Sequence, residues 1–245
     1  MIDLVAAEWL KLRTTRLLYG MIPAAVAISF ASVAGAVLSA DSGRGELESA
    51  DGIRRTLSVT GTGAIVVLVT GILIAAGEYR HGTAADTFLT TPQRHRVLAA
   101  KLVVGAGVGL ASGAVTSLAC VGIAGFLYNV KGATFPFDDG VVWLTLAGAL
   151  VYTALFAILG VALGSLLRNQ VLAVAGALAW LAVIEHTLVN LVPEIGRWLP
   201  AAAGQAIVRT PLDGLLSPLA GVVLLAAYGA VITMAGIRVA ATRDA

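Results

Sequence analysis

Long uncharged stretches alternate with short polar segments along this chain. Five uncharged runs are each longer than twenty residues, and they cover 17–40, 56–77, 102–130, 140–167 and 214–237. A sixth run, 169–184, meets Glu185 and His186 and then continues apolar to Val192. A helix needs about 20 apolar residues to cross the hydrocarbon core of a membrane, and an open strand there would leave backbone groups without hydrogen bonds. The pattern therefore predicts an all-α integral membrane protein with six spans.

We expect a single transmembrane domain over residues 1–245. The expected spans cover about 17–40, 57–77, 97–122, 141–167, 170–192 and 214–238. The first run is longer than the core of a cleaved signal, so we expect it to be retained; cleavage near the small residues 34–36 is the alternative. Residues 41–55 read as a polar loop. Residues 193–213, which contain three prolines around an apolar stretch, predict a re-entrant or interfacial segment before the last span.

The residues that precede the first span are also patterned. Residues 3–16 combine Trp9 and aliphatic side chains with Lys and Arg. This mixture is typical of a helix that lies in the membrane interface, with its basic end against anionic headgroups. A simple flank of the first span is the alternative interpretation.

Composition agrees with a membrane protein, and charge predicts its orientation. Hydrophobic residues make up 58% of the chain, charged residues 12%, and the mean hydropathy is +0.92. If the N-terminus is cytoplasmic, ten of the 16 Lys and Arg residues lie inside and six outside, which follows the positive-inside tendency. We therefore expect both termini in the cytoplasm. The net charge of +2 gives no support for binding nucleic acid.

The most distinctive polar segment, 78–101, joins the second and third expected spans. Gly82 can break a helix, and Thr83 with Asp86 fits a short capping pattern. Thr91 followed by Pro92 fits the start of the next helix. We expect a short helix that lies across the inner face of the membrane; an amphipathic surface turn is the alternative.

Two motifs in the sequence resemble a known transporter family. The first comprises Glu78-Tyr79-Arg80-His81-Gly82-Thr83, Leu89-Thr90-Thr91-Pro92, Arg94 and Ala100-Lys101. It resembles the loop between spans two and three of type-2 ABC export permeases. The second, Glu8-Trp9-Leu10-Lys11-Leu12-Arg13, is similar to the start of many such subunits. The resemblance extends over essentially the whole chain. It implies a permease subunit that forms the translocation path of an ATP-driven exporter in a cell membrane, the plasma membrane of a bacterium.

The resemblance also implies which residues meet a partner. Residues 78–91 would form a coupling helix that docks on an ATPase subunit, with the N-terminal helix packed beside this joint. The implied coupling residues are Glu78, Tyr79, Arg80, His81, Gly82, Thr83, Asp86, Phe88, Leu89, Pro92 and Arg94. The sequence has no GxxxxGK[ST] phosphate loop. We therefore expect a non-catalytic chain without a cofactor, and ATP and Mg on a separate ATPase. A second permease chain, identical or different, and membrane lipid complete the expected assembly.

Glycines recur at four-residue spacing in two of the expected spans. They are Gly105, Gly109 and Gly113 in the third span, and Gly160 and Gly164 in the fourth. Small residues at this spacing allow helix backbones to approach closely. We favour packing within the chain, and a dimer interface is the alternative.

Glu185 and His186 form the one pair of neighbouring ionisable residues, one of them acidic, inside an expected span. Ionisable groups in spans are costly and often functional, so a place on the substrate path is one interpretation. A pair near the interface, bonded to the polar outer segment, is the other. An ion-coupled carrier or a scaffold without an ATPase is the alternative function, and an intramembrane protease using Ser112 with His186 is a more distant one. Three scattered histidines predict no metal site.

Overall fold

Six long apolar helical segments form the framework of the molecule. The computed structural model describes residues 1–40, 44–80, 82–83 and 93–242. The predicted all-α architecture with six membrane-spanning helices is confirmed. The spans cover Leu17–Leu38, Ala50–Arg80, Arg94–Val130, Gly140–Leu167, Gln170–Leu191 and Pro218–Val239. Within the described ranges no strand is present.

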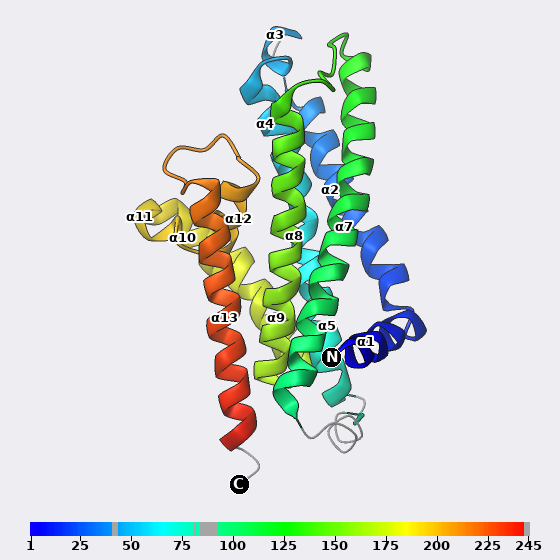
Figure 1. Cartoon of the computed structure of the whole chain (residues 1–245). Coiled ribbons are helices and arrows are strands. Elements are labelled where there is room, and N and C mark those ends of the chain that lie inside the picture. The colour runs from blue at the N-terminus through cyan, green and yellow to red at the C-terminus, as the bar shows by residue number, and fades with distance from the viewer. Residues whose placement is uncertain (41–43, 81, 84–92, 243–245) are drawn as a thin grey trace.

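The first half of the chain builds three spans and the helix that crosses one end of them. Helix α1 lies across the end of the bundle, and α2 rises from it as the first span (Figure 1). The second span is assembled from α4, the 3₁₀ segment η1 and α5, and the third is the long helix α7. The bounds are α1 Ile2–Thr14, α2 Leu17–Leu38, α3 Arg44–Leu47, α4 Ala50–Ser58, η1 Val59–Gly63, α5 Ala64–Arg80 and α7 Arg94–Val130.

The second half contains one continuous span, one interrupted span and one terminal span. Helix α8 is the fourth span, and α9, the π-helical segment η2 and α10 make up the fifth. Two short helices precede the last span, α13. The bounds are α8 Gly140–Leu167, α9 Gln170–Ala179, η2 Trp180–Glu185, α10 His186–Leu191, α11 Pro193–Gly196, α12 Pro200–Ile207 and α13 Pro218–Thr242.

Helix α8 is the central helix of the bundle. It packs against α5, α7 and α13 along its length and also contacts α4, α9 and α12. The span formed by α9, η2 and α10 is the least covered, and most of its apolar side chains face outward. Helices that are apolar on all sides are suited to lipid or to a further protein surface. Exposed and buried spans therefore coexist in one chain.

Two ends of the bundle can be distinguished (Figure 1). At the α1 end lie α1, the last turn of α5, the first turn of α7 and the end of α13. At the opposite end, here named the α4 end, lie α3, α4 and the turn between α7 and α8. The N-terminus and the last described turn of α13 both lie towards the α1 end.

The segment expected to be a polar loop, 41–55, is helical over most of its described part. Ser49 caps α4, because its hydroxyl oxygen accepts a hydrogen bond from the Gly52 amide at 3.1 Å. Ile53 and Leu57 are buried, whereas Arg54 and Arg55 lie on the more exposed side. Three of the charged residues that suggest a loop, Asp51, Arg54 and Arg55, therefore lie on one face of an amphipathic helix.

The 3₁₀ segment in the second span has its backbone groups satisfied by the first span. The Ser29 hydroxyl donates to the Thr60 carbonyl oxygen at 2.9 Å and accepts from the Gly63 amide at 2.9 Å. Backbone groups inside a membrane need internal partners. A cap of this kind allows a tighter helical turn at Val59–Gly63 without an unpaired amide.

The segment expected to be re-entrant or interfacial, 193–213, contains α11 and α12. Helix α12 is too short to span a membrane, and it is buried against α8 and α13. Pro193 and Pro200 each occupy the first turn of a short helix, where a proline costs no hydrogen bond. This segment therefore folds back into the bundle before α13 begins.

Candidate functional site

Glu8 and Lys11 are the charged residues of α1 that contact the bundle. They are three positions apart and so lie on one face of the helix. Leu12, on the adjacent position, is buried with Ile74 and Val104 in an apolar cluster. Helix α1 is therefore fastened to α5 and α7 by both apolar and charged side chains.

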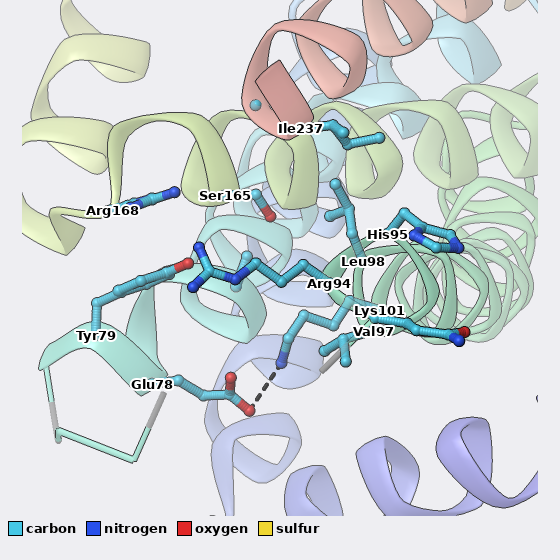
Figure 2. A pocket seen from close by; sticks show the side chains of 13 residues that line it. Glu78, Tyr79, Arg94, His95, Val97, Leu98, Lys101, Ser165, Arg168 and Ile237 are labelled. Carbon is cyan, nitrogen blue, oxygen red and sulfur yellow. Dashed lines mark ion pairs between the residues drawn. The ribbon is translucent and has the colours of Figure 1, made fainter. Parts of the chain in front are cut away.

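A four-residue cluster of alternating charge joins α1 to the ends of α5 and α7. The ammonium group of Lys11 lies 2.6 Å from Glu8 Oε1 and 2.7 Å from Glu78 Oε1. The ammonium group of Lys101 lies 2.6 Å from Glu8 Oε2 and 2.8 Å from Glu78 Oε1. Each lysine thus contacts both carboxylates. We call Glu8, Lys11, Glu78 and Lys101 the charge cluster; Figure 2 shows its Glu78–Lys101 pair.

Burial differs between the two lysines of the charge cluster. The side chain of Lys101 is 7% exposed, and that of Lys11 is 43% exposed. Partial burial alone would lower the pKa of Lys11, but its hydrogen bonds and ion pairs with Glu78 and Glu8 raise the pKa above its ordinary value. Lys11 therefore stays protonated at neutral pH. Two carboxylates and two ammonium groups then balance, which is the condition under which buried charge is tolerated.

The last turn of α5 ends in a Schellman motif next to the charge cluster. Gly82 adopts the left-handed conformation with φ of 72°, and the Thr83 amide donates to the Glu78 carbonyl oxygen at 3.0 Å. A glycine in this conformation with a six-residue closing bond is the usual form of this helix end. The break that the sequence indicates at Gly82 therefore has a backbone cause, and the same residue, Glu78, contributes to both the helix end and the charge cluster.

The other described residues of the 78–94 segment occupy two different environments. The Tyr79 ring is stacked under the guanidinium of Arg168, whose Cζ lies 5.7 Å from the ring centre. Arg80 is exposed at the end of α5, and Arg94 begins α7 and lines a cavity with Tyr79. Five further residues of the expected coupling set lie outside the described part of the chain: His81, Asp86, Phe88, Leu89 and Pro92.

Three members of the charge cluster were not recognised as a site from sequence. Glu8 and Lys11 stand only in the motif at the chain start, and Lys101 only at the end of the motif that begins at Glu78. Two signals were available. The charges of Glu8 and Lys11 lie three positions apart in a helix with apolar neighbours, and Lys101 is followed directly by a long uncharged run. Neither signal names the partner across 67 or 93 residues of sequence.

The regularly spaced glycines lie between helices of this same chain. Gly109 of α7 faces α8, and a Cβ placed there would lie 2.6 Å from the Ala154 Cα. Gly164 of α8 faces α5, where a Cβ would lie 2.7 Å from the Ile72 carbonyl oxygen. Gly105 and Gly113 likewise face α8, and Gly160 faces α5. These positions allow the central helix to approach both neighbours at backbone distance.

Glu185 is buried at the end of the π-helical segment. It is 1% exposed, and its Oε1 accepts hydrogen bonds from the amides of Ala201 and Ala202 at the start of α12. The second oxygen, Oε2, has no hydrogen-bond partner within the described residues. His186 is instead exposed and lies 3.4 Å from the Asn190 amide nitrogen. The pair therefore separates, with Glu185 capping α12 and His186 on the surface.

Metal binding and serine–histidine chemistry each require side chains that lie close together. Among the described residues no group of three or more His, Cys, Asp or Glu side chains could hold a metal ion. Ser112 is buried in α7 at 2% exposure, whereas His186 is exposed in α10.

Comparison with protein families gives one match, which covers most of the chain. Residues 4–184 match the family described as ABC-2 family transporter protein. No curated protein matches the chain. The matched region contains all four residues of the charge cluster and ends immediately before Glu185.

Proposed function

We propose that this chain, which belongs to the ABC-2 transporter family, couples ATP hydrolysis on a separate subunit to movement of a substrate through the membrane. Family membership supports a role as a membrane component of an ABC transporter. We propose further that residues 78–94, whose described ends lie at the α1 end, receive the motion of the ATPase. The α1 end would then face the cytoplasm, in accordance with the distribution of basic residues.

The charge cluster is the observation that supports this proposal most. Residues 78–94 connect α5 to α7 in the sequence, and the charge cluster holds these two helices to each other and to α1. Because each lysine contacts both carboxylates, displacement of one helix end strains the contacts of the other two. A push on the segment is therefore transmitted to α1, α5 and α7 together rather than absorbed in a loose loop.

Close backbone contacts connect the helices of the charge cluster to the rest of the bundle. Gly160 and Gly164 bring α8 against α5, and Gly109 brings α8 against α7. Tightly packed helices move as bodies and shift between discrete arrangements. We propose that ATP-driven closure of the ATPase pair moves the α1 end and so rocks the first, second and fifth spans to open a path outward.

The proposed assembly contains two permease chains and two ATPase chains. ATP and Mg would be bound by the ATPase subunits, and this chain would perform no hydrolysis. The fifth span leaves most of its apolar surface uncovered, which provides room for a second permease chain or for lipid. A bacterial plasma membrane is the proposed location.

Photo-crosslinking from the end of α5 tests the coupling proposal. A photoreactive amino acid at Arg80, which is exposed next to the charge cluster, should capture an ATPase subunit in native membranes. The matched control is the same probe at Val130, which is 64% exposed at the other end of the bundle. We expect an ATPase adduct from Arg80 alone. Capture of lipid only, with no ATPase recovered from either position, would reject the proposal.

One observation favours a second candidate, a carrier driven by an ion gradient. Glu185 is a buried carboxylate in a span with one oxygen lacking a partner among the described residues, and carriers place such groups near the membrane midplane. Transport by purified chain in vesicles separates the two. An ion gradient that drives transport without any ATPase would favour the carrier, and transport that requires an ATPase and ATP would favour the permease.

A further inference from the structure

A cavity lies within this chain between the second, fourth and fifth spans and α12. It encloses about 520 Å³ and is lined mainly by apolar side chains, with Ser58, Thr62 and Gln205 among them. We propose that this cavity binds a lipophilic ammonium compound, that is, an apolar body that carries one protonated amine. The proposal concerns binding by the permease chain alone, so its outcome is separate from that of coupling to an ATPase.

The cavity can be reached from the side of the bundle. Ile65 of α5 and Leu178 of α9 both line it, and they are 40% and 37% exposed. A lipophilic molecule dissolved in the membrane can therefore enter between the second and fifth spans. The volume lies within the range of cavities that hold small molecules, about 300–1,000 Å³. The site is thus large enough for a compound with one or two rings.

The aromatic wall of the cavity is fixed by two glycines. The Tyr152 ring lies between η1 and α12, because a Cβ at Gly61 would be 3.0 Å from the ring and a Cβ at Gly204 would be closer still. Phe156, one turn further along α8, meets the Tyr152 ring edge-to-face with 4.5 Å between the ring centres. This wall is therefore formed before a ligand arrives, and aromatic rings suit both an apolar body and a cation.

The polar groups of the lining are suited to accept hydrogen bonds. The Ser58 and Thr62 hydroxyls donate to the carbonyl oxygens of Arg55 and Val59, at 3.3 and 2.8 Å. A hydroxyl has one hydrogen to donate and two lone pairs, so both can only accept from a ligand. The Oε1 atom of Gln205 is buried and has no hydrogen-bond partner among the described residues. These oxygens favour a ligand that carries donors.

A buried carboxylate lies behind the wall of the cavity. Glu185 is 1% exposed, and its Oε2 has no hydrogen-bond partner among the described residues. Its Oε1 accepts from the Ala201 amide, and both Ala201 and Ala182, three positions before Glu185, line the cavity. Arg209 follows Val208 of the lining but does not itself contribute to it. An unpaired buried charge is costly, and apolar surroundings screen its attraction little, which favours an amine over an uncharged alcohol.

Equilibrium binding of three naphthalene compounds to the purified chain tests the proposal. They are 1-naphthylmethylamine, which is protonated at neutral pH, the corresponding alcohol, and 1-methylnaphthalene, which has no donor. Each is tritiated and titrated in detergent, and binding to empty micelles is subtracted. We expect the amine to bind about tenfold more tightly than the alcohol, the difference between a charge-assisted and a neutral hydrogen bond, and the hydrocarbon to bind most weakly. Equal binding of all three would overturn the proposal.

A pair of tryptophan substitutions locates the binding. Ala182 and Ala175 are both exposed residues of the fifth span, but of the two only Ala182 lines the cavity. Ala182→Trp places a large side chain in the cavity and should abolish binding of the amine. Ala175→Trp adds the same bulk outside the cavity and should leave binding unchanged. The unfolding temperatures show that both variants are folded. Equal binding of the amine by the two folded variants would place it elsewhere and overturn the site.

A charge variant tests the choice of an amine. Glu185→Gln removes the charge but keeps a carbonyl oxygen for the α12 amides, so the amine should lose its roughly tenfold advantage while the alcohol binds as before. Glu194→Gln is the matched control, because Glu194 is exposed in the neighbouring α11 and its removal should leave the ratio unchanged. A general loss of structure would weaken both compounds, so the ratio reports the charge alone. An unchanged ratio in Glu185→Gln would overturn the assignment of an ammonium ligand.

Discussion

The charge cluster and Glu185 solve the problem of buried charge in opposite ways. In the charge cluster, two carboxylates and two ammonium groups contact one another across three helices. At Glu185, a single carboxylate is held by two backbone amides of α12, and one of its oxygens has no partner among the described residues. A balanced cluster resists separation of its helices, whereas a lone carboxylate at a helix end ties two elements through one side chain. The charge cluster therefore holds parts of three helices together at the α1 end, whereas Glu185 connects the fifth span to α12 through one side chain.

The largest effect is expected when the buried lysine of the charge cluster is removed. Lys101→Met leaves Glu8 and Glu78 with only the half-exposed Lys11, and loss of one partner of a buried ion pair costs about 3–5 kcal/mol. We expect a loss of this size in the free energy of unfolding, measured by denaturant titration in detergent. Lys131→Met is the matched control, since that lysine bonds two carbonyl oxygens in a more exposed position at the α4 end.

A double variant shows whether charge imbalance causes that loss. Glu8→Gln combined with Lys101→Met removes one charge of each sign, so the remaining pair, Lys11 and Glu78, stays balanced. We expect the double variant to be more stable than Lys101→Met alone. If it is less stable, packing of the Lys101 side chain rather than its charge holds α1, α5 and α7 together.

The next largest loss of stability is expected at Glu185, where the carboxylate accepts two amides of α12. Glu185→Leu removes the acceptor of the Ala201 and Ala202 amides, and burying donors without partners costs about 1–3 kcal/mol. Glu185→Gln keeps a carbonyl oxygen for those amides and should retain nearly the stability of the unaltered chain. Denaturant titration of both variants checks the order.

The Gln variant also decides between the two interpretations of Glu185. If the residue only caps α12, Glu185→Gln should transport substrate at the unaltered rate in reconstituted vesicles containing the ATPase. Lost transport with unchanged stability would place the negative charge on the substrate path, as one of the sequence hypotheses holds.

A smaller effect is expected at the helix end beside the charge cluster. Gly82 has φ of 72°, and a Cβ there would meet no atom of the described residues within 4 Å. Any cost of Gly82→Ala is therefore conformational, about 1 kcal/mol. Gly77→Ala lies within α5, where a Cβ would likewise meet no atom of the described residues within 4 Å, and it should be neutral or slightly stabilising. Thermal unfolding of the two variants in one detergent gives the comparison. Equal effects of the two variants on the unfolding temperature would mean that the left-handed conformation at Gly82 contributes nothing to stability.

The parts of the molecule that sequence predicts are those governed by local pattern. Uncharged runs of spanning length predict the six spans, because the membrane imposes that length on each of them separately. The helix end at Gly82 can also be predicted from the sequence, because a helix end depends on residues close to it in the chain. Helix α4 is obscured because its charged residues lie on one exposed face, and a charge count over 41–55 does not separate the faces.

The charge cluster could not be predicted, because its contacts join distant parts of the chain. Lys11 meets Glu78 across 67 residues, and Lys101 meets Glu8 across 93. Each residue alone is typical of a membrane edge, where long side chains reach headgroups. For Glu185, one of the two sequence interpretations names the right segment, since Ala201 and Ala202 belong to the outer segment 193–213, but the sequence does not specify which amides, 16 and 17 residues away, the carboxylate accepts. Pairing across helices follows from how the spans pack, which a single sequence does not specify.

The smallest loss of stability is expected when Lys11 is removed. This variant tests whether burial determines how much each lysine of the charge cluster contributes to the free energy of unfolding. Lys11 and Lys101 contact the same two carboxylates at similar distances, yet their side chains are 43% and 7% exposed. Exposed ion pairs contribute about 0.2–1 kcal/mol because water screens them, so Lys11→Met should lower the free energy of unfolding by less than about 1 kcal/mol. Denaturant titration beside Lys101→Met gives the ratio. Similar losses in the two variants would show that the four side chains act as one unit whose strength depends on balance, and burial would then no longer explain why the α1 end holds together.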